Sequence, residues 1–258
     1  MQLTVAHLYP DQLNIYADRG NMAVLERRAA WRGIELTYTP VPRDGQLPPR
    51  LDLVYIGGGQ DREQGLIAPD LARHATRLRA CVEDGAALLA VCGGYQLLGR
   101  FYRDRVGSEL PGVGLFPHST VAGETRMIGD VLLESDLEEN QPRPIAGFEN
   151  HAGRTTLEAG ALPLGRVVRG FGNNGTDGLE GCRLGNAIGT YLHGPLLPRN
   201  PWLADWLLSR ALEHATGKEV SLDPLGDEVE ALAFAVAAKR ARSRSRRFGR
   251  RRSPARMS

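Results

Sequence analysis

The stretch AALLAVCGGYQLLG, residues 86–99, places a cysteine where an apolar strand pattern gives way to a helical one. Residues 87–91 are apolar throughout, which is typical of a strand covered on both faces. Cys92 comes next, directly followed by Gly93 and Gly94. Hydrolases with a G-x-S-x-G elbow use such a sharp turn to hold a nucleophile beyond the sheet edge. The stretch therefore predicts an α/β fold whose elbow carries a thiol, and the N–H groups that begin the helix favour the thiolate form.

A buried and inert cysteine is the alternative interpretation, because such residues are common in strands. That interpretation gives no reason for two consecutive glycines, which let other backbone segments come close to the turn. Cys81 lies in a helical pattern and Cys182 in a loop-like stretch, so we expect both to be structural. Three scattered cysteines also exclude a disulfide framework and a C-x-x-C metal site.

The preceding segments extend the α/β pattern. Strand patterns occupy residues 2–8, 35–41 and 51–57, and helical patterns occupy about 21–32 and 66–84. Together with the strand before the cysteine, this order predicts a mostly parallel central sheet with flanking helices on both faces.

The pattern changes in the second half of the chain. Between residues 100 and about 190, short strand-like pieces are separated by Gly, Pro and Asn, which predicts antiparallel strands added to one side of the sheet. Residues 201–217 predict an amphipathic helix, with Pro201 in its first turn and Gly217 at its end. Residues 226–247 predict a last helix that leads into the C-terminal tail.

The charge of the chain is unevenly distributed. The 258 residues carry a net charge of +2, yet residues 239–258 hold ten of the 32 Lys and Arg and no acid. The remaining residues therefore carry 22 bases against 30 acids. Such a tail can contact an anionic membrane surface or simply solubilise a disordered end. Phe248 is its one aromatic residue, so we expect no nucleic-acid partner.

The N-terminal sequence MQLTVAHLYPDQ lacks the basic and long apolar regions of a signal peptide. No apolar stretch reaches the ~20 residues that cross a bilayer. With so few cysteines, these features predict a cytoplasmic protein.

A nucleophilic thiol for acyl transfer also needs donors that stabilise the oxyanion. The loop 57–60 (GGGQ) follows the apolar strand 51–57, where ligand loops of open α/β sheets are found. Its N–H groups, with that of Gly93, are candidates for this role. A glycine-rich loop can instead hold phosphate. However, no G-K-[ST] follows it, which disfavours a P-loop.

The general acid and base is a histidine in the favoured interpretation. His193 ends a strand pattern just before Gly194 and Pro195, which places it at a sheet edge. His151 is the second candidate, either close to the site or merely structural. The remaining four have no glycine-rich context: His7, His74, His118 and His214.

These residues carry a family resemblance. The elbow CGGYQ, the upstream GGG loop and the late YLHGP resemble a class I, cobyric acid synthase-like glutamine amidotransferase. Within that branch, the chain resembles the GatD family, the glutaminase subunits of lipid II isoglutaminyl synthase. The resemblance covers roughly residues 3–215 and rests on four motifs: LNIYADRGN (13–21), GGGQDREQ (57–64), GETRMIGD (123–130) and GFENHAGRT (147–155). The resemblance implies an amidotransferase domain at 1–217. Outside it, we expect a C-terminal helical region at 218–238 and a basic, disordered tail at 239–258.

The resemblance also implies roles for single residues. Cys92 corresponds to the nucleophile and His193 to the base, and Arg126 corresponds to an arginine that holds the substrate glutamine. A guanidinium can bind an α-carboxylate through two parallel hydrogen bonds, so this role is chemically sensible. Gly58 and Gly93 would donate to the oxyanion.

The chain departs from the general amidotransferase pattern at two positions. Ala90 stands where a glycine usually precedes the cysteine by two residues, and Pro195 stands where a glutamate usually follows the histidine. Such a glutamate would complete a triad with the cysteine and the histidine. We therefore expect this third member of the triad from elsewhere, and a partner subunit that docks over His193 is the favoured source.

The reaction implied is hydrolysis of L-glutamine to glutamate and ammonia. We expect no cofactor and no metal in this chain, with ATP and Mg²⁺ on a Mur-ligase-like partner of a heterodimer that amidates the D-glutamate of lipid II in peptidoglycan synthesis. Two alternatives stay open at this point: a glutaminase of another pathway, such as corrinoid amidation, and a non-catalytic binding module with a decayed site. Pro195 is the main argument for the latter.

Overall fold

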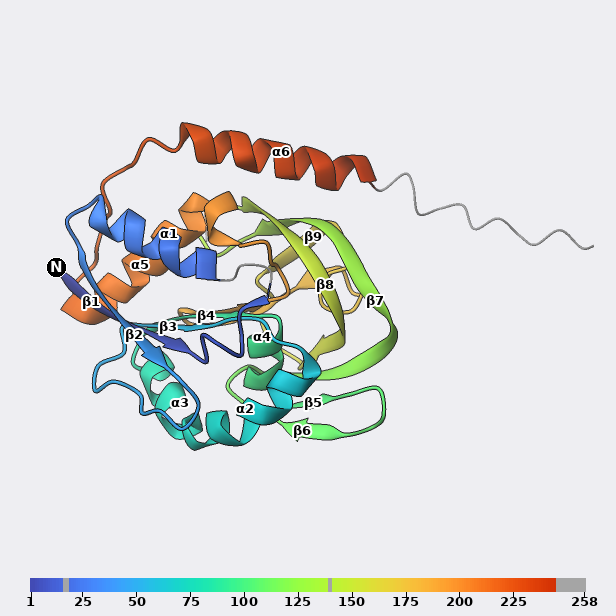
Figure 1. Ribbon diagram of the computed structural model, residues 1–258. Coiled ribbons are helices and arrows are strands. Elements are labelled where there is room, and N and C mark those ends of the chain that lie inside the picture. Colours follow the sequence, from blue (N-terminus) through green and yellow to red (C-terminus); the bar gives the residue numbers. More distant parts are fainter. Residues whose placement is uncertain (16–18, 139–140, 245–258) are drawn as a thin grey trace, which may run out of the picture.

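The computed structural model describes residues 1–15, 19–138 and 141–244 (Figure 1). A central sheet of six strands has the order β11-β12-β4-β3-β1-β2. Its strands are parallel except β11, which pairs with β12 in the antiparallel direction. The mostly parallel central sheet is thus confirmed. Its bounds are β1 Gln2–Leu8, β2 Glu35–Val41, β3 Leu53–Ile56, β4 Ala87–Val91, β11 Cys182–Leu184 and β12 Ala187–Thr190.

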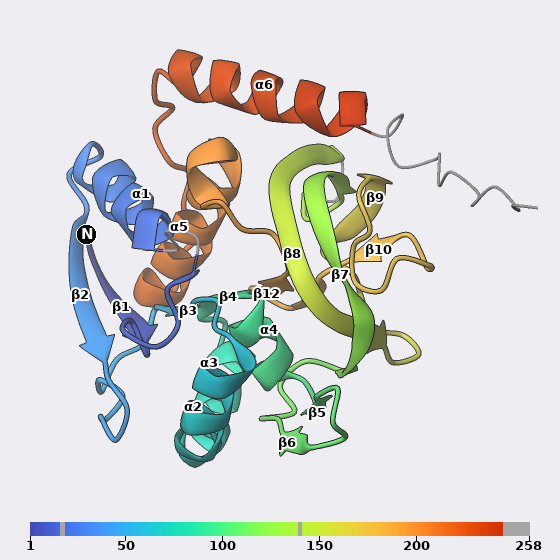
Figure 2. The ribbon, with the colours of Figure 1, turned by 45° about the vertical axis from the view of Figure 1, so that its right-hand side comes forward.

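Helices cover both faces of the central sheet, as expected. α1 (Arg19–Ala30) and α5 (Pro201–Thr216) lie on one face, whereas α2 (Asp61–Arg73), α3 (Ala75–Glu83) and α4 (Gly93–Leu98) lie on the other (Figures 1 and 2). Because β3 and β4 are sandwiched between these layers, all their residues are buried. This burial explains their uniformly apolar sequences.

The single helix expected over 66–84 is wrong in its extent. The helical segment begins at Asp61 and is divided into α2 and α3 at His74. The amide of His74 donates to the carbonyl of Leu71, three residues earlier, and this tighter turn ends the first helix. α2 also contains Pro69, which cannot donate a backbone hydrogen bond.

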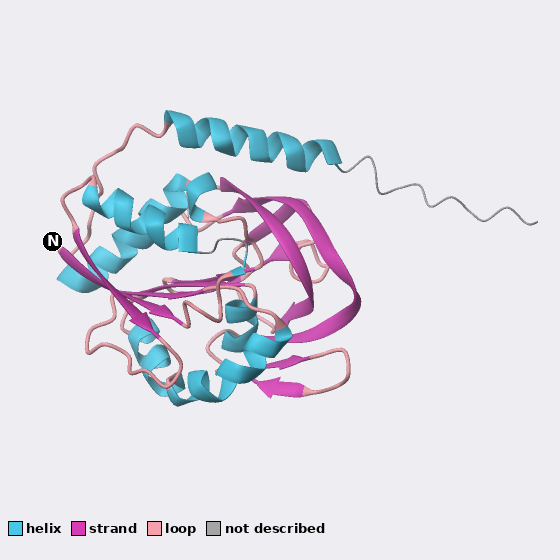
Figure 3. Ribbon diagram, in the orientation of Figure 1, coloured by secondary structure: helices cyan, strands magenta, loops and turns pink. Residues whose placement is uncertain are grey.

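The antiparallel strands form a second sheet beside the central one (Figure 3). Its main feature is the long hairpin of β7 (His118–Ser135) and β8 (Arg143–Leu157). The shorter strands are β5 Phe101–Arg103, β6 Glu109–Pro111, β9 Gly165–Arg169 and β10 Leu179–Glu180. β7 pairs with β9 in the antiparallel direction and with β5 in the parallel direction, while β10 and β6 pair with β9 and β5 in turn. Only β11 extends the central sheet in the antiparallel direction.

The last helix, α6 (Glu228–Arg244), lies across the outside of the molecule (Figure 1). Ala238 and Ala241 pack against Leu132 of β7 and Ala146 of β8. The helix therefore continues into the segment expected as a tail from residue 239, and that boundary was set too early. The rest of the tail, 245–258, lies outside the described residues. Within the described part of the chain, no helix is long and apolar enough to cross a membrane.

Candidate active site

The cysteine elbow has the strained backbone that a nucleophile turn requires. Cys92 follows β4 with φ of 49° and ψ of −102°, and few non-glycine residues have a positive φ. Its amide donates to the carbonyl of Thr190 in β12 at 2.8 Å, and its carbonyl accepts from the amide of Gln96 in α4 at 2.9 Å. The turn is thus fixed on both sides.

The two glycines after the cysteine are required by close backbone contacts, as the sequence indicated. A Cβ at Gly93 would lie 2.8 Å from the amide nitrogen of Gly59, and a Cβ at Gly94 would lie 2.9 Å from the carbonyl oxygen of Gly57. The amide of Gly94 donates to that same carbonyl at 3.1 Å. Any side chain at these two positions would push the glycine-rich loop away from the elbow.

The glycine-rich loop follows β3 and lies against the elbow. Gly59 contributes to the pocket wall, while the carbonyl of Gly58 accepts a hydrogen bond from the amide of Ile15 at 3.2 Å. The expected oxyanion donors, Gly58 and Gly93, therefore belong to backbone segments in contact with each other through Gly59. Their role as donors stays a prediction.

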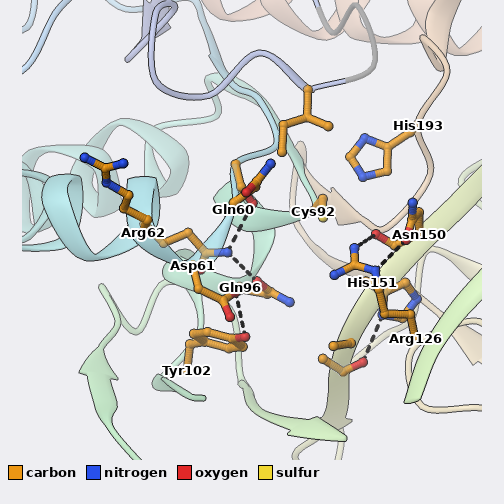
Figure 4. Close-up of a pocket in the computed structure, with 15 residues that line it drawn as sticks. Gln60, Asp61, Arg62, Cys92, Gln96, Tyr102, Arg126, Asn150, His151 and His193 are labelled. Atoms are coloured by element: carbon orange, nitrogen blue, oxygen red, sulfur yellow. Dashed lines mark hydrogen bonds between the residues drawn. The ribbon is translucent and has the colours of Figure 1, made fainter. Parts of the chain in front are cut away.

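His193 lies just beyond the end of β12. Its amide donates to the carbonyl of Phe148 at 2.7 Å, and the amide of Phe148 donates back at 3.2 Å. This bridge joins the end of β12 to β8, so both sheets hold the histidine backbone. The imidazole is 1% exposed and shares the pocket with Cys92 (Figure 4).

Arg126 lies in an irregularity of the β7–β8 hairpin. The pairing register shifts between Ala122 and Met127, so the intervening residues bulge from the ladder. Its Nε donates to the side-chain oxygen of Asn150 at 2.7 Å, and its Nη2 donates to the Asn150 carbonyl at 2.6 Å. These two bonds fix the guanidinium at the pocket wall (Figure 4).

The three predicted residues line one cavity of about 430 Å³, a size suited to a small ligand. They come from separate parts of the sequence: Cys92 after β4, Arg126 from β7 and His193 after β12. Several other polar residues of the wall were not predicted from the sequence: Gln60, Asp61, Arg62, Gln64, Gln96, Tyr102 and Asn150. Several of these lie within the motifs 57–64 and 147–155, which marked them as a group without giving individual roles.

A buried hydrogen-bond network underlies the pocket. Gln64 Nε2 donates to Gln96 Oε1 at 2.9 Å, and Gln96 Nε2 donates to the hydroxyl of Tyr191 at 3.1 Å. That hydroxyl also lies 2.7 Å from the hydroxyl of Thr155. The network joins α2, α4, β8 and the segment before His193, and it fixes the floor of the site.

His151, the second candidate base, also lines the pocket. Its ring stacks on Tyr191 with centroids 3.6 Å apart and planes 6° apart. Nδ1 lies 2.9 Å from the carbonyl of Gly153, and Nε2 lies 3.7 Å from a carboxylate oxygen of Glu149. Burial lowers the pKa of His151, and the Glu149 charge opposes this effect. The ring is thus held from three sides, which fits a supporting role.

The other four histidines lie elsewhere, as expected. His7 bonds Tyr38 within the region of β1 and β2, and burial lowers its pKa to about 4. Burial lowers the pKa of His118 to about 3. His74 separates α2 from α3, and His214 of α5 lies 3.0 Å from Asp52.

The other two cysteines have environments that keep the thiol protonated. Burial raises the pKa of Cys81 to about 11 and that of Cys182 to about 12. Cys81 lies in α3 and Cys182 in β11. Since the thiolate is the nucleophile, neither is suited to catalysis.

A buried carboxyl, Glu180, supports the strand end that leads to His193. One oxygen, Oε1, accepts from the Thr190 hydroxyl at 2.6 Å and from the amide of Tyr191 at 2.7 Å. Burial raises the pKa of Glu180 to about 7. In residues 1–15, 19–138 and 141–244, no three His, Cys, Asp or Glu side chains are grouped as ligands for a metal ion.

Comparison with known proteins places these features in a family. Residues 4–201 match the CobB/CobQ-like glutamine amidotransferase domain. The chain is 40% identical to the lipid II isoglutaminyl synthase (glutamine-hydrolyzing) subunit GatD of Staphylococcus aureus (strain N315), over 93% of this chain and 96% of that protein. It is 38% identical to the GatD subunit of Streptococcus pneumoniae (strain ATCC BAA-255 / R6), over 88% of this chain and 86% of that protein.

A more distant relative is the cobyric acid synthase of Pelotomaculum thermopropionicum, with 34% identity over 75% of this chain but 37% of that protein. Among solved structures, PurLQS from Thermotoga maritima aligns with a TM-score of 0.57 at 18% identity, over 84% of this chain and 100% of that chain. A glutamine amidotransferase from the same organism aligns with a TM-score of 0.52 at 17% identity, over 93% of this chain and 92% of that chain. These structures support the fold.

Proposed function

Since this chain belongs to the CobB/CobQ-like glutamine amidotransferase family, we propose that it hydrolyses L-glutamine to glutamate and ammonia as the glutaminase subunit of a lipid II isoglutaminyl synthase. The observation that carries the proposal is the meeting of Cys92, His193 and Arg126 in one cavity. A thiol, an imidazole and a guanidinium are the groups that an amide-hydrolysing site for an amino acid needs.

The reaction begins with attack of the Cys92 thiolate on the side-chain amide carbon of glutamine. Backbone N–H groups near the elbow stabilise the tetrahedral oxyanion. His193 then donates a proton to the leaving nitrogen, which departs as ammonia and leaves a glutamyl thioester on Cys92. Finally, His193 takes a proton from a water molecule, which attacks the thioester and releases glutamate and the thiolate.

The ammonia serves a partner subunit in this proposal. The named GatD relatives are subunits of a synthase, and the chain covers nearly all of the first. We propose a Mur-ligase-like partner that holds ATP and Mg²⁺ and amidates the D-glutamate of lipid II. The corrinoid alternative is weaker, because the cobyric acid synthases are more than twice as long as the region matched and are less similar.

The C-terminal helix supports contact of this subunit with an anionic membrane surface. Since α6 packs inward through Ala238 and Ala241, its opposite face points outward. That face carries Val229, Leu232 and Val236, which are 75%, 69% and 58% exposed. Ten Lys and Arg follow within residues 239–258. Apolar side chains beside a basic segment are the combination that binds anionic bilayers.

The direct test is a glutaminase assay of the purified chain, with and without its synthetase partner. The proposal predicts ammonia and glutamate in equal amounts. A chain that binds glutamine without releasing ammonia in either condition would instead be a non-catalytic binding module.

A further inference from the structure

The pocket has a buried floor and an exposed rim, which differ in charge. Cys92 and His193 at the floor are 7% and 1% exposed. Asp61, Arg62 and Arg126 at the rim are exposed, and all five residues line the same cavity (Figure 4). Because full charges are costly to remove from water, a ligand with one amide end and one charged end fits with its amide inward.

Asp61 is the one carboxylate among the described residues that line this cavity. It is the first residue of α2, so it follows the glycine-rich loop directly. The hydroxyl of Tyr102 donates to Oδ1 of Asp61 at 2.9 Å. A carboxylate has about four acceptor positions, so this bond orients the group and leaves capacity for a ligand.

Tyr102 is well suited to hold this carboxylate. Its side chain is 1% exposed, on β5. Burial, followed by the negative charge of Asp61, raises the pKa of Tyr102. The phenol therefore remains protonated and keeps donating to Asp61 through the neutral pH range.

Arg126 supplies the opposite charge from the second sheet, on another side of the pocket from Asp61 (Figure 4). Its bonds to Asn150 use Nε and one N–H of Nη2. Since a guanidinium has five N–H donors, three remain for a ligand carboxylate. The rim thus offers one fixed anion and one fixed cation above the thiol.

We propose that Asp61 binds the α-ammonium group of the substrate while Arg126 binds its α-carboxylate. This assignment rests on the proposed glutaminase function and adds to it a selection rule: the pocket takes zwitterionic α-amino acids with a side-chain amide. An ω-amide that has the carboxylate but no ammonium leaves Asp61 without its partner and binds poorly.

The test compares L-glutamine with its desamino analogue, 4-carbamoylbutanoate, as substrates of the chain in complex with its synthetase partner. We expect kcat/KM to favour glutamine by about 10- to 100-fold, which is less than the ~10⁴ of fully buried polar sites because Asp61 is exposed. Asp61→Asn should lower kcat/KM for glutamine by a similar factor and leave the analogue nearly unaffected. Tyr102→Phe should weaken the same preference, mainly through KM.

Glu124→Gln is the matched control, since Glu124 is also an exposed carboxylate but is not among the described residues that line the cavity. It should not reduce the preference for glutamine. Alkylation of Cys92 by iodoacetamide at an unchanged rate will show that the Asp61→Asn site is intact. The inference is wrong if Asp61→Asn affects both substrates equally or affects neither. If the wild-type complex hydrolyses neither, the proposed function itself fails, which is a separate outcome.

Discussion

The amide of Cys92 donates a hydrogen bond of 2.8 Å to the carbonyl of Thr190, three residues before His193. The backbone of the proposed nucleophile is therefore tied directly to the strand that leads to the proposed base. Because β4 and β12 are parallel neighbours with Val91 opposite Thr190, one pairing register determines the positions of both Cys92 and His193. Changes that shift this register should affect both groups together.

The first prediction concerns the nucleophile. Cys92→Ser should abolish ammonia release and leave the fold intact, because oxygen replaces sulfur with little change in shape but is far less acidic. A glutamine-analogue electrophile should label Cys92, as read by mass spectrometry of the digested protein. Stoichiometric labelling at Cys81 or Cys182 instead would contradict the assignment.

A second prediction concerns Arg126. Arg126→Ala should lower kcat/KM for glutamine on the order of 10- to 100-fold, mainly through KM, because a charge-assisted contact to the substrate is lost. Ammonia supplied in excess to the complex should restore synthesis by both Arg126→Ala and Cys92→Ser. If it does not, the chain contributes more than ammonia.

Pro195 leads to a third prediction. In serine triads, loss of the carboxylate beside the histidine costs about 10⁴ in kcat, and Pro195 occupies the sequence position where amidotransferases usually have a glutamate. We expect weak glutaminase activity for the isolated chain and a rise of at least about tenfold on adding the partner. Equal rates for chain and complex would indicate an acceptor within this chain.

Glu180 gives a prediction on stability. Its folded-state pKa of about 7 lies above the ordinary value of 4.5, because burial disfavours the charged form. Its contribution to stability is therefore complete below pH 4.5 and declines as the pH rises toward 7. Relative to Glu180→Gln, the free energy of unfolding of the wild type should fall by roughly 3 kcal/mol over this range. Denaturant titrations at pH 5 and 7.5 measure it, and a pH-independent difference would contradict the buried titration.

The tail should be dispensable for chemistry. Removal of residues 245–258 leaves α6 complete and should not change glutaminase activity, since the helix packs through residues before this point. Binding to vesicles with anionic lipid should weaken and should also weaken at higher salt, whereas neutral vesicles should show no such change. Loss of catalysis in the truncated chain would show that the tail contacts the site or the partner.

The sequence predicted those features that depend on local patterns. Apolar runs identified β3 and β4, and Gly93 and Gly94 after Cys92 identified the elbow, because only a close backbone approach requires two glycines there. Pro69 was the one residue near His74 that disfavours a continuous helix, and it was not taken into account, so the division of α2 from α3 was missed. The β7–β8 hairpin was read as separate short pieces, because its Gly residues interrupt the pattern of alternation.

The pocket wall could be predicted only in part, because it depends on the meeting of distant segments. Asp61 and Tyr102 are 41 positions apart, and their hydrogen bond depends on α2 packing near β5. Asp61 lies in the motif 57–64, which gave it no individual role, and Tyr102 lies outside the recognised motifs. The roles of Gly58 and Gly93 as oxyanion donors remain predictions.

The irregularity in β7 is a place where the hairpin can accept insertions and deletions. Regular pairing resumes at Met127 opposite His151 and holds on the other side at Ala122 opposite Gly153. A residue inserted or deleted between these points changes the direction of Arg126 without shifting the register of either ladder. In an ordinary strand the same change would turn every later side chain to the opposite face. With the proposed role of Arg126, substrate preference can therefore diverge among descendants of this sequence by small insertions and deletions, while the scaffold that carries the thiol stays intact.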